Sequence, residues 1–229
     1  IKYTRYAIGE IVLVVIGILI ALWINQQAQY SKERVDEIKV LKEIRKNLDS
    51  DLTEIGVDIT YMDTVTISSN ELLIYLKKHD KPNDDFGEHT MKMRTTPHFN
   101  PNTSGYNLLT SKGIEIIQNS ELRNAIANHY ESLYRYYNLY EKERINLRLL
   151  HLDPVLIDYF SWEYIPESAF LGTYTIIEED YQKLKVNDTF KKLILSVQRE
   201  NILVQDRAIR VRKSIETLSK LLDEELAKH

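Results

Sequence analysis

The chain has 229 residues, with 30 Lys or Arg against 34 Asp or Glu and a formal net charge of −4, which disfavours binding to nucleic acid. It has no cysteine, which excludes disulfide scaffolds, thiolate metal sites and cysteine nucleophiles. Seven glycines and five prolines are few for this length and argue against a protein built from strands and turns. This size suits one ordinary domain with an attachment, or two very small domains.

The first thirty residues differ in composition from the rest of the chain. Residues 7–24 read AIGEIVLVVIGILIALWI, and Glu10 is the one charged residue among them. In an α-helix this stretch reaches about 27 Å, close to the hydrocarbon thickness of a bilayer. Tyr3, Tyr6 and Trp23 lie near its ends, where interfacial aromatic residues belong. We therefore expect a membrane anchor at residues 1–30 with a span at about 7–24.

Two other interpretations of this segment compete with an uncleaved anchor. A buried core helix can be as apolar, but it rarely opens with basic and aromatic residues and ends in an amide cluster such as Asn25-Gln26-Gln27. A cleaved signal peptide has a shorter core and a small-residue cleavage site, which Leu22-Trp23-Ile24 does not provide. Because the first residue is Ile1 and not Met, we expect further residues upstream.

Residues 6–22, YAIGEIVLVVIGILIAL, resemble the signature of a large family of uncharacterised single-span membrane proteins from Bacteroidetes. The similarity is near word for word over residues 3–25 and looser beyond, where it includes residues 113–117 and 121–123. The chain departs from the family pattern at Trp23 and at residues 26–28. The resemblance implies a basic N-terminal tail in the cytoplasm and a large domain in the periplasm, hence the inner membrane, and it implies no known activity. The visible charges alone are nearly balanced across the span.

The body at residues 31–229 is expected to be a helical periplasmic domain. No Gly or Pro occurs between Gly17 and Gly56, so the helix of the span should continue into the body, with a kink near Gly56 or the β-branched residues 64–67. Apolar residues of this helix recur at steps of three and four. They are Ile38, Leu41, Ile44, Leu48, Leu52, Ile55, Ile59 and Met62.

The middle of the chain holds half of its glycines and prolines. Residues 79–102 are expected to form a long and mobile polar loop. Thr103-Ser104 could cap a short helix that ends near Gly113. A long helix from about Ser120 follows, and a further helix should start at Asp153-Pro154 and run through Ile165. The apolar stripe of the long helix is expected at Leu122, Ile126, His129, Leu133, Tyr137, Tyr140, Leu147 and Leu150.

The last helix is the most regular, with Asn187 or Asp188 as its cap. Its apolar positions form a seam of three heptads, which either packs inside a bundle or pairs subunits as a coiled coil. We expect the first and last long helices to form an antiparallel stalk that returns the C-terminus towards the membrane. The seam residues are Asn201, Val204, Ala208, Val211, Ile215, Leu218 and Leu222.

Glu10 is the residue with the clearest functional signal, because a carboxylate inside a span is costly. It can snorkel to the interface near Arg5, bind a neighbouring helix, or handle ions as in the peptidoglycan-side subunits of ion-driven motors, which the chain resembles in layout only. Gly17 and Ala21 form a small-xxx-small pair that allows close helix approach. We expect membrane helix packing through Glu10, Gly9, Gly17 and Ala21.

A second candidate is a run of tyrosines on the long middle helix. Five tyrosines in eleven helical residues cover more than one face, so either they pack in the core or some form a patch that binds a protein or a ligand. They are Tyr130, Tyr134, Tyr136, Tyr137 and Tyr140. The acidic residues near His89 could bind a divalent ion weakly, but no tight metal motif is present.

Together these observations predict an all-α protein with one N-terminal transmembrane helix and a domain of long antiparallel helices. No catalytic, cofactor or metal motif is found, so enzymatic activity is not expected. The expected function is that of a scaffold or accessory subunit that oligomerises or binds a membrane-protein partner. The alternatives are an ion-coupled subunit that uses Glu10 and a periplasmic ligand sensor.

Overall fold

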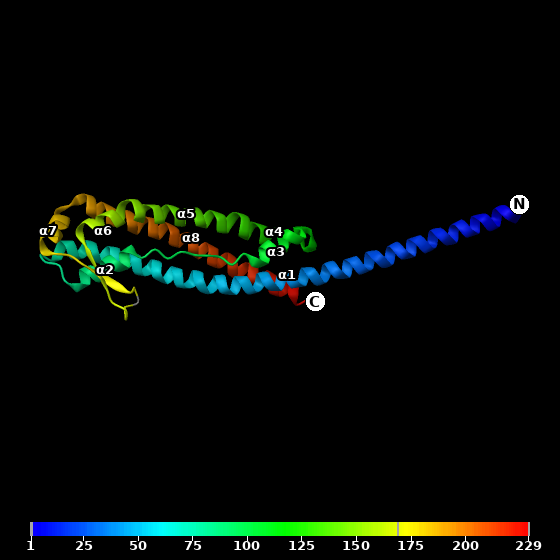
Figure 1. Cartoon of the computed structure of the whole chain (residues 1–229), viewed down its shortest axis with the longest axis horizontal. Coiled ribbons are helices and arrows are strands. Elements are labelled where there is room, and N and C mark those ends of the chain that lie inside the picture. The colour runs from blue at the N-terminus through cyan, green and yellow to red at the C-terminus, as the bar shows by residue number, and fades with distance from the viewer. Residues whose placement is uncertain (1, 169, 229) are drawn as a thin grey trace.

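The computed structural model describes residues 2–168 and 170–228, with side chains described at residue 10 and from residue 12 onward within these ranges. It is a helical rod from which one helix projects (Figure 1). The elements in chain order are α1 (Lys2–Lys78), α2 (Asp84–Arg94), α3 (Ser104–Lys112), the 3-10 turn η1 (Ile114–Ile116), α4 (Ser120–Ala127), the π-helical η2 (Asn128–Tyr134), α5 (Arg135–Leu147), the π-helical η3 (Arg148–Leu152), α6 (Asp153–Tyr159), β1 (Ser161–Tyr164), β2 (Gly172–Thr175), α7 (Glu178–Val186) and α8 (Asp188–Leu226).

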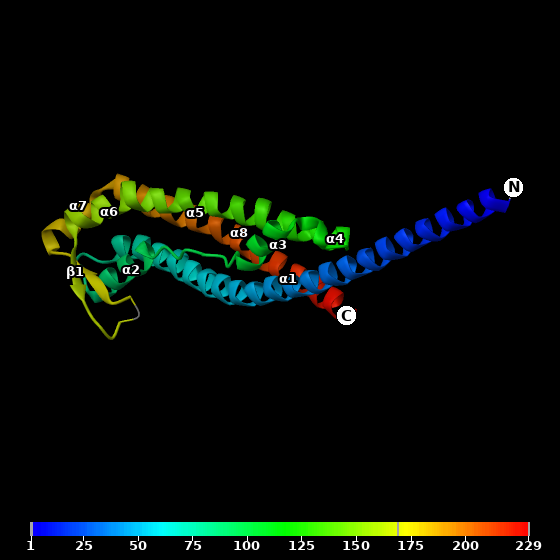
Figure 2. The same ribbon diagram turned by 45° about the vertical axis from the view of Figure 1, so that its right-hand side comes forward.

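The long first helix is confirmed, and it stays α-helical through Gly56 and the β-branched residues. No break occurs at the expected kink; instead α1 bows, with its convex side away from the other helices (Figure 2). Long helices commonly curve in this way around a core. Leu41, Ile44 and Leu48 are fully buried, as the apolar periodicity predicts.

The antiparallel stalk of α1 and α8 is also confirmed. Its two helices run side by side in both views, and the C-terminus lies where α1 leaves the bundle (Figures 1 and 2). Asn187 caps α8 by accepting a hydrogen bond from the Phe190 amide at 3.1 Å. The whole heptad seam from Asn201 to Leu222 is buried within the chain, so it packs inside the bundle and is not available to pair subunits.

Residues 84–94 correct the expectation of a loop. Asn83 caps α2 through the Phe86 amide, and acidic residues begin the helix while basic residues end it, which suits the helix dipole. Phe86, Thr90 and Met93 lie on one face and are buried. The prediction was wrong because these few apolar positions are surrounded by charged residues and become buried only when α2 packs on α1 and on β2.

The second correction concerns the helix that was expected to run from Asp153 through Ile165. It ends at Tyr159, and residues 161–164 form a strand that pairs antiparallel with β2, Ser161 opposite Thr175 and Tyr164 opposite Gly172. Aromatic and β-branched residues in these two segments favour strands. Strands this short form only when they pair with each other, and the pattern of one segment does not reveal that pairing. The fold is therefore mostly helical with a small two-stranded sheet, not all-α.

Two apolar clusters form the core, one in the half of the bundle near the projecting helix and one at the far end. Met62, Tyr137 and Val204 belong to the first cluster, and Leu72, Met93 and Ile194 belong to the second. Between them lie Arg144 and Asn201, which are buried and polar. The rod is therefore divided by a polar layer.

Candidate functional site

The projecting part of α1 is exposed at each described side chain from Val12 to Ile24. It is long and apolar enough to cross a membrane, with a mean hydropathy of 1.7 over its most apolar window and none of that window buried. Its large side chains are about half exposed, for example Leu19 at 59%. A core helix of this bundle is therefore excluded as an interpretation of the segment. Such an apolar surface needs lipid or a partner to cover it.

The residues expected to pack in the membrane lie on this helix. Glu10 and Ala21 are exposed, and nothing lies within 4 Å of the position that a Cβ at Gly17 would take. Their spacing of seven and four residues in a continuous helix places the three on one side. Gly9 lies outside the residues whose surroundings the structure describes. This side is open to another helix.

A buried acidic residue holds α1 where it enters the bundle. Glu37 is fully buried, accepts a hydrogen bond from the Gln118 amide at 3.0 Å and pairs with Arg34. Nearby, Asn119 donates to Glu225 of α8 at 2.9 Å. These contacts fasten α1 to the loop before α4, and that loop to the end of α8.

The tyrosine run does not form one patch. Tyr130, Tyr134 and Tyr137 are buried in the core, whereas Tyr136 is 51% exposed and Tyr140 is half-buried. The two outer hydroxyls lie 2.8 Å apart, and the guanidinium of Arg207 lies 3.4 Å from the Tyr140 ring centroid. An interaction patch stays a prediction for the outer pair alone.

The π-helical η2 explains which tyrosines are buried. A π turn holds an extra residue, so it shifts the inward face of the helix by one position. From the end of η2 onward the buried positions are therefore Tyr134, Tyr137 and Glu141. An uninterrupted α-helix would have placed Leu133 and Tyr140, which are half-buried, on the inward face together with Tyr137.

Polar side chains of α1 hold the extended segment between α2 and α3. Asn47 accepts from the Gly105 amide at 2.7 Å, Asp51 from the Asn102 amide at 2.8 Å and Glu54 from the Asn100 amide at 2.9 Å. Asp51 also accepts from the Tyr134 hydroxyl at 2.7 Å. The spacing of four and three residues places the acceptors on one face of α1. Residues 95–103 are therefore fastened to α1, which corrects the expectation of a mobile loop.

The next acidic residue on this face, Asp58, has an unsatisfied oxygen. It is 7% exposed, and its Oδ2 atom has no hydrogen-bond partner within the described structure. Desolvation, and then the charge of Glu54, raise the pKa of Asp58 to about 6. Burial likewise raises the pKa of Glu141, whose Oε1 accepts from the Phe99 amide at 3.0 Å.

Replacing Asp58 by Asn should stabilise the protein at neutral pH. Because the pKa of Asp58 in the folded state lies above the ordinary value of 3.8, the folded state binds the proton more tightly, and stability falls as pH rises from about 4 to 6. We expect Asp58→Asn to raise the free energy of unfolding at pH 7.5 by about 1–2 kcal/mol, after allowance for solvent screening, and to have little effect at pH 4.

Thermal unfolding of the full chain in detergent measures this effect. The control is Asp63→Asn, on the exposed side of the same helix. An equal stabilisation at both pH values would contradict the assigned burial cost.

A groove opens at the end of the rod far from the projecting segment of α1. It has a volume of about 720 Å³ and lies between α2 and the β1–β2 hairpin. The α2 backbone lies directly on β2, since a Cβ at Gly87 would meet the Tyr174 carbonyl oxygen at 1.7 Å. The carboxylates of Asp84 and Glu163 and the apolar side chains of Met91 and Phe170 line the groove.

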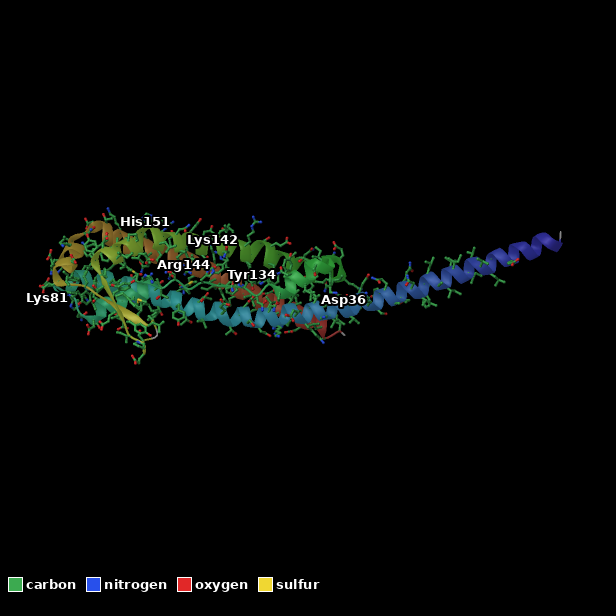
Figure 3. The ribbon with its side chains drawn as sticks, viewed as in Figure 1. Asp36, Lys81, Tyr134, Lys142, Arg144 and His151 are labelled. Carbon is green, nitrogen blue, oxygen red and sulfur yellow. The ribbon has the colours of Figure 1, made fainter. Side chains whose placement is uncertain are left out.

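Sequence reasoning missed the buried charges Asp51, Glu141 and Arg144. Figure 3 shows Tyr134 and Arg144 on the inner side of the middle helix, and Lys142 and His151 towards its outside. The available signal was the spacing of 134, 137, 141 and 144, in which charged residues continue the apolar stripe. Among the residues that the structure describes, no three His, Asp or Glu side chains gather as a metal site requires.

Comparison with known proteins gives one positive result. No curated protein and no solved structure matches the chain. The model of a family of unknown function, DUF6090, matches residues 10–161, which run from the apolar N-terminal segment of α1 through its polar face and the middle helix to the start of β1. This match covers more than half of the chain, and the chain therefore belongs to the DUF6090 family.

Proposed function

We propose that this protein is a non-enzymatic, membrane-anchored scaffold or accessory subunit that assembles through its span. The observation that carries the proposal is the continuity of α1, which passes without a break from an exposed apolar segment to the centre of the bundle. Because the helix is continuous, a partner that binds its apolar segment in the membrane also fixes where the helical rod lies outside the membrane. The partner is a second copy of the chain or another membrane protein.

The proposed topology places the N-terminus in the cytoplasm and the domain of residues 31–229 in the periplasm, anchored in the inner membrane by residues 1–30. The resemblance of residues 3–25 to the Bacteroidetes signature supports this orientation. The return of α8 brings the C-terminus back beside α1 (Figure 1).

The mass of the complex extracted from native membranes in mild detergent tests the proposal. A homo-oligomer or a co-purifying multi-pass protein supports it, and a clean monomer contradicts it. The matched pair of variants is Gly17→Leu with Ala21→Leu, on the open side, and Val15→Leu with Leu19→Ile, elsewhere on the same helix. We expect the first pair to weaken association about tenfold or more and the second to leave it unchanged.

A separate test of Glu10 distinguishes a role in packing against a partner helix from a role in ion coupling. If Glu10 hydrogen-bonds to a partner helix, Glu10→Gln retains that bond in part and leaves the complex assembled, whereas Glu10→Leu weakens it. If ion coupling is its role, both variants assemble and the partner's proton or ion flux is lost. Unchanged assembly and flux in both variants would remove Glu10 from either role.

The distal groove favours one second candidate, a ligand sensor. Its wall α2 packs on α1, so occupation of the groove could reach the span through one helix. A scaffold predicts unchanged complex size when groove residues such as Phe170 are replaced. A sensor predicts a change in complex size when a ligand is added.

A further inference from the structure

A small cavity lies in the polar layer that separates the two apolar clusters. Its volume is about 20 Å³, and residues of α1, α2, α5, η3 and α8 and of the segment after α2 line it. Three arginines, Arg94, Arg144 and Arg148, are among the lining residues, and no acidic residue is. A cavity of this size holds one water molecule or one ion of similar size.

The charge of Arg144 is not matched by a direct partner. Its exposed fraction is 6%, and no carboxylate lies within ion-pair distance of it in the described part of the chain. It donates to Asn201 Oδ1 at 3.4 Å and to the Pro97 carbonyl oxygen, while its Nε has no partner among the described atoms. A buried guanidinium without a counter-charge is costly, because both charge and hydrogen bonds must be satisfied.

The other two arginines add charge to the same place. Asp153 accepts from Arg94 Nε at 2.8 Å and lies 3.9 Å from Arg148 Nε, so one carboxylate serves two guanidinium groups. Arg148 Nε also lacks a hydrogen-bond partner in the described structure. Asp58 and Glu141 act on Arg144 from a longer distance and do not line the cavity. Three guanidinium groups, with no carboxylate among the lining residues, and the unpartnered Nε–H donors of Arg144 and Arg148 therefore surround a space that is too small for large ligands.

We propose that this cavity binds a single small monatomic anion, of which chloride is the type. The anion supplies the counter-charge that Arg144 lacks and accepts hydrogen bonds from the Nε–H groups of Arg144 and Arg148. A tetrahedral oxyanion such as sulfate is too large for the space, and a cation is repelled. Since the cavity lies between the two clusters, the anion joins the two halves of the rod. This goes beyond the proposed scaffold function and does not depend on it.

Thermal unfolding of the full chain in detergent tests the site, with the anion varied at constant ionic strength. Raising chloride from about 1 mM to about 300 mM in place of methanesulfonate should raise the midpoint by about 4–8 °C, as expected for a Kd near 10 mM. Bromide should act like chloride. Equal midpoints in all three salts would overturn the proposal and assign the cavity to water.

Variants locate the effect. Arg148→Met removes one donor from the cavity without emptying the core and should abolish most of the chloride dependence, whereas the exposed Arg199→Met should keep it. Val197→Glu places a carboxylate in the lining and should replace the anion, giving a high midpoint without chloride, while Val197→Gln should not. A chloride effect that survives in Arg148→Met would overturn this location.

Discussion

Replacing Gly105 by Ala should destabilise the protein by about 3 kcal/mol, the cost of overpacking a close contact. A Cβ at this position would lie 2.7 Å from the backbone nitrogen of Ile44 and 2.9 Å from its Cα. Backbone atoms of a buried helix cannot move aside as a flexible side chain can. The Gly105 amide also donates to Asn47 at 2.7 Å, and this bond lengthens if α3 is pushed away from α1.

A second glycine provides the matched control. Gly56 lies inside α1, and nothing is within 4 Å of the position of its Cβ. Gly56→Ala should therefore stabilise the protein by about 0.5–1 kcal/mol, because alanine loses less conformational entropy in a helix. Thermal unfolding of both variants should give shifts of opposite sign. A loss of stability below about 1 kcal/mol in Gly105→Ala would show that α3 does not lie this close to α1.

Acid should destabilise the protein through His129. This side chain is 1% exposed, its Nδ1 atom lies 2.9 Å from the Ser214 hydroxyl, and its Nε2 atom has no partner in the described structure. Desolvation lowers the pKa of His129 from 6.5 to about 4. The unfolded chain therefore takes up a proton before the folded one does, and stability is lost as pH falls from about 6.5 to 4. The expected loss is about 3 kcal/mol.

The comparison of wild type with His129→Gln measures this loss. Asp58 contributes in the opposite direction between about pH 4 and 6, but the difference between the two proteins at each pH cancels that contribution. We expect the variant to lose much less stability in acid, and His151→Gln, on the exposed side of the rod, to behave as wild type. Identical acid dependence in wild type and His129→Gln would contradict the assigned shift.

The sequence predicted the arrangement of candidate site residues only where their spacing along one helix fixes which side they share. The side of the span with Glu10, Gly17 and Ala21 follows from helical geometry, and the structure leaves it open. The sequence indicated that the five tyrosines cover more than one face of the helix, but not which of them are buried. A π turn decides this, because its extra residue rotates the residues that follow it and leaves no periodic signal of its own.

The sequence by itself determined the apolar N-terminal segment, the long first and last helices, a cap for α8 at Asn187 or Asp188, and the heptad seam. These features depend on residues three, four or seven positions apart, which local periodicity records. Only the tertiary structure decided the packing of α2, the β1–β2 pairing and the polar layer around Arg144. Each of these joins segments distant in the chain, such as Arg144 and Asn201 or Asp51 and Asn102. Their stability comes from pairing and burial between those segments, which spacing along one segment does not encode.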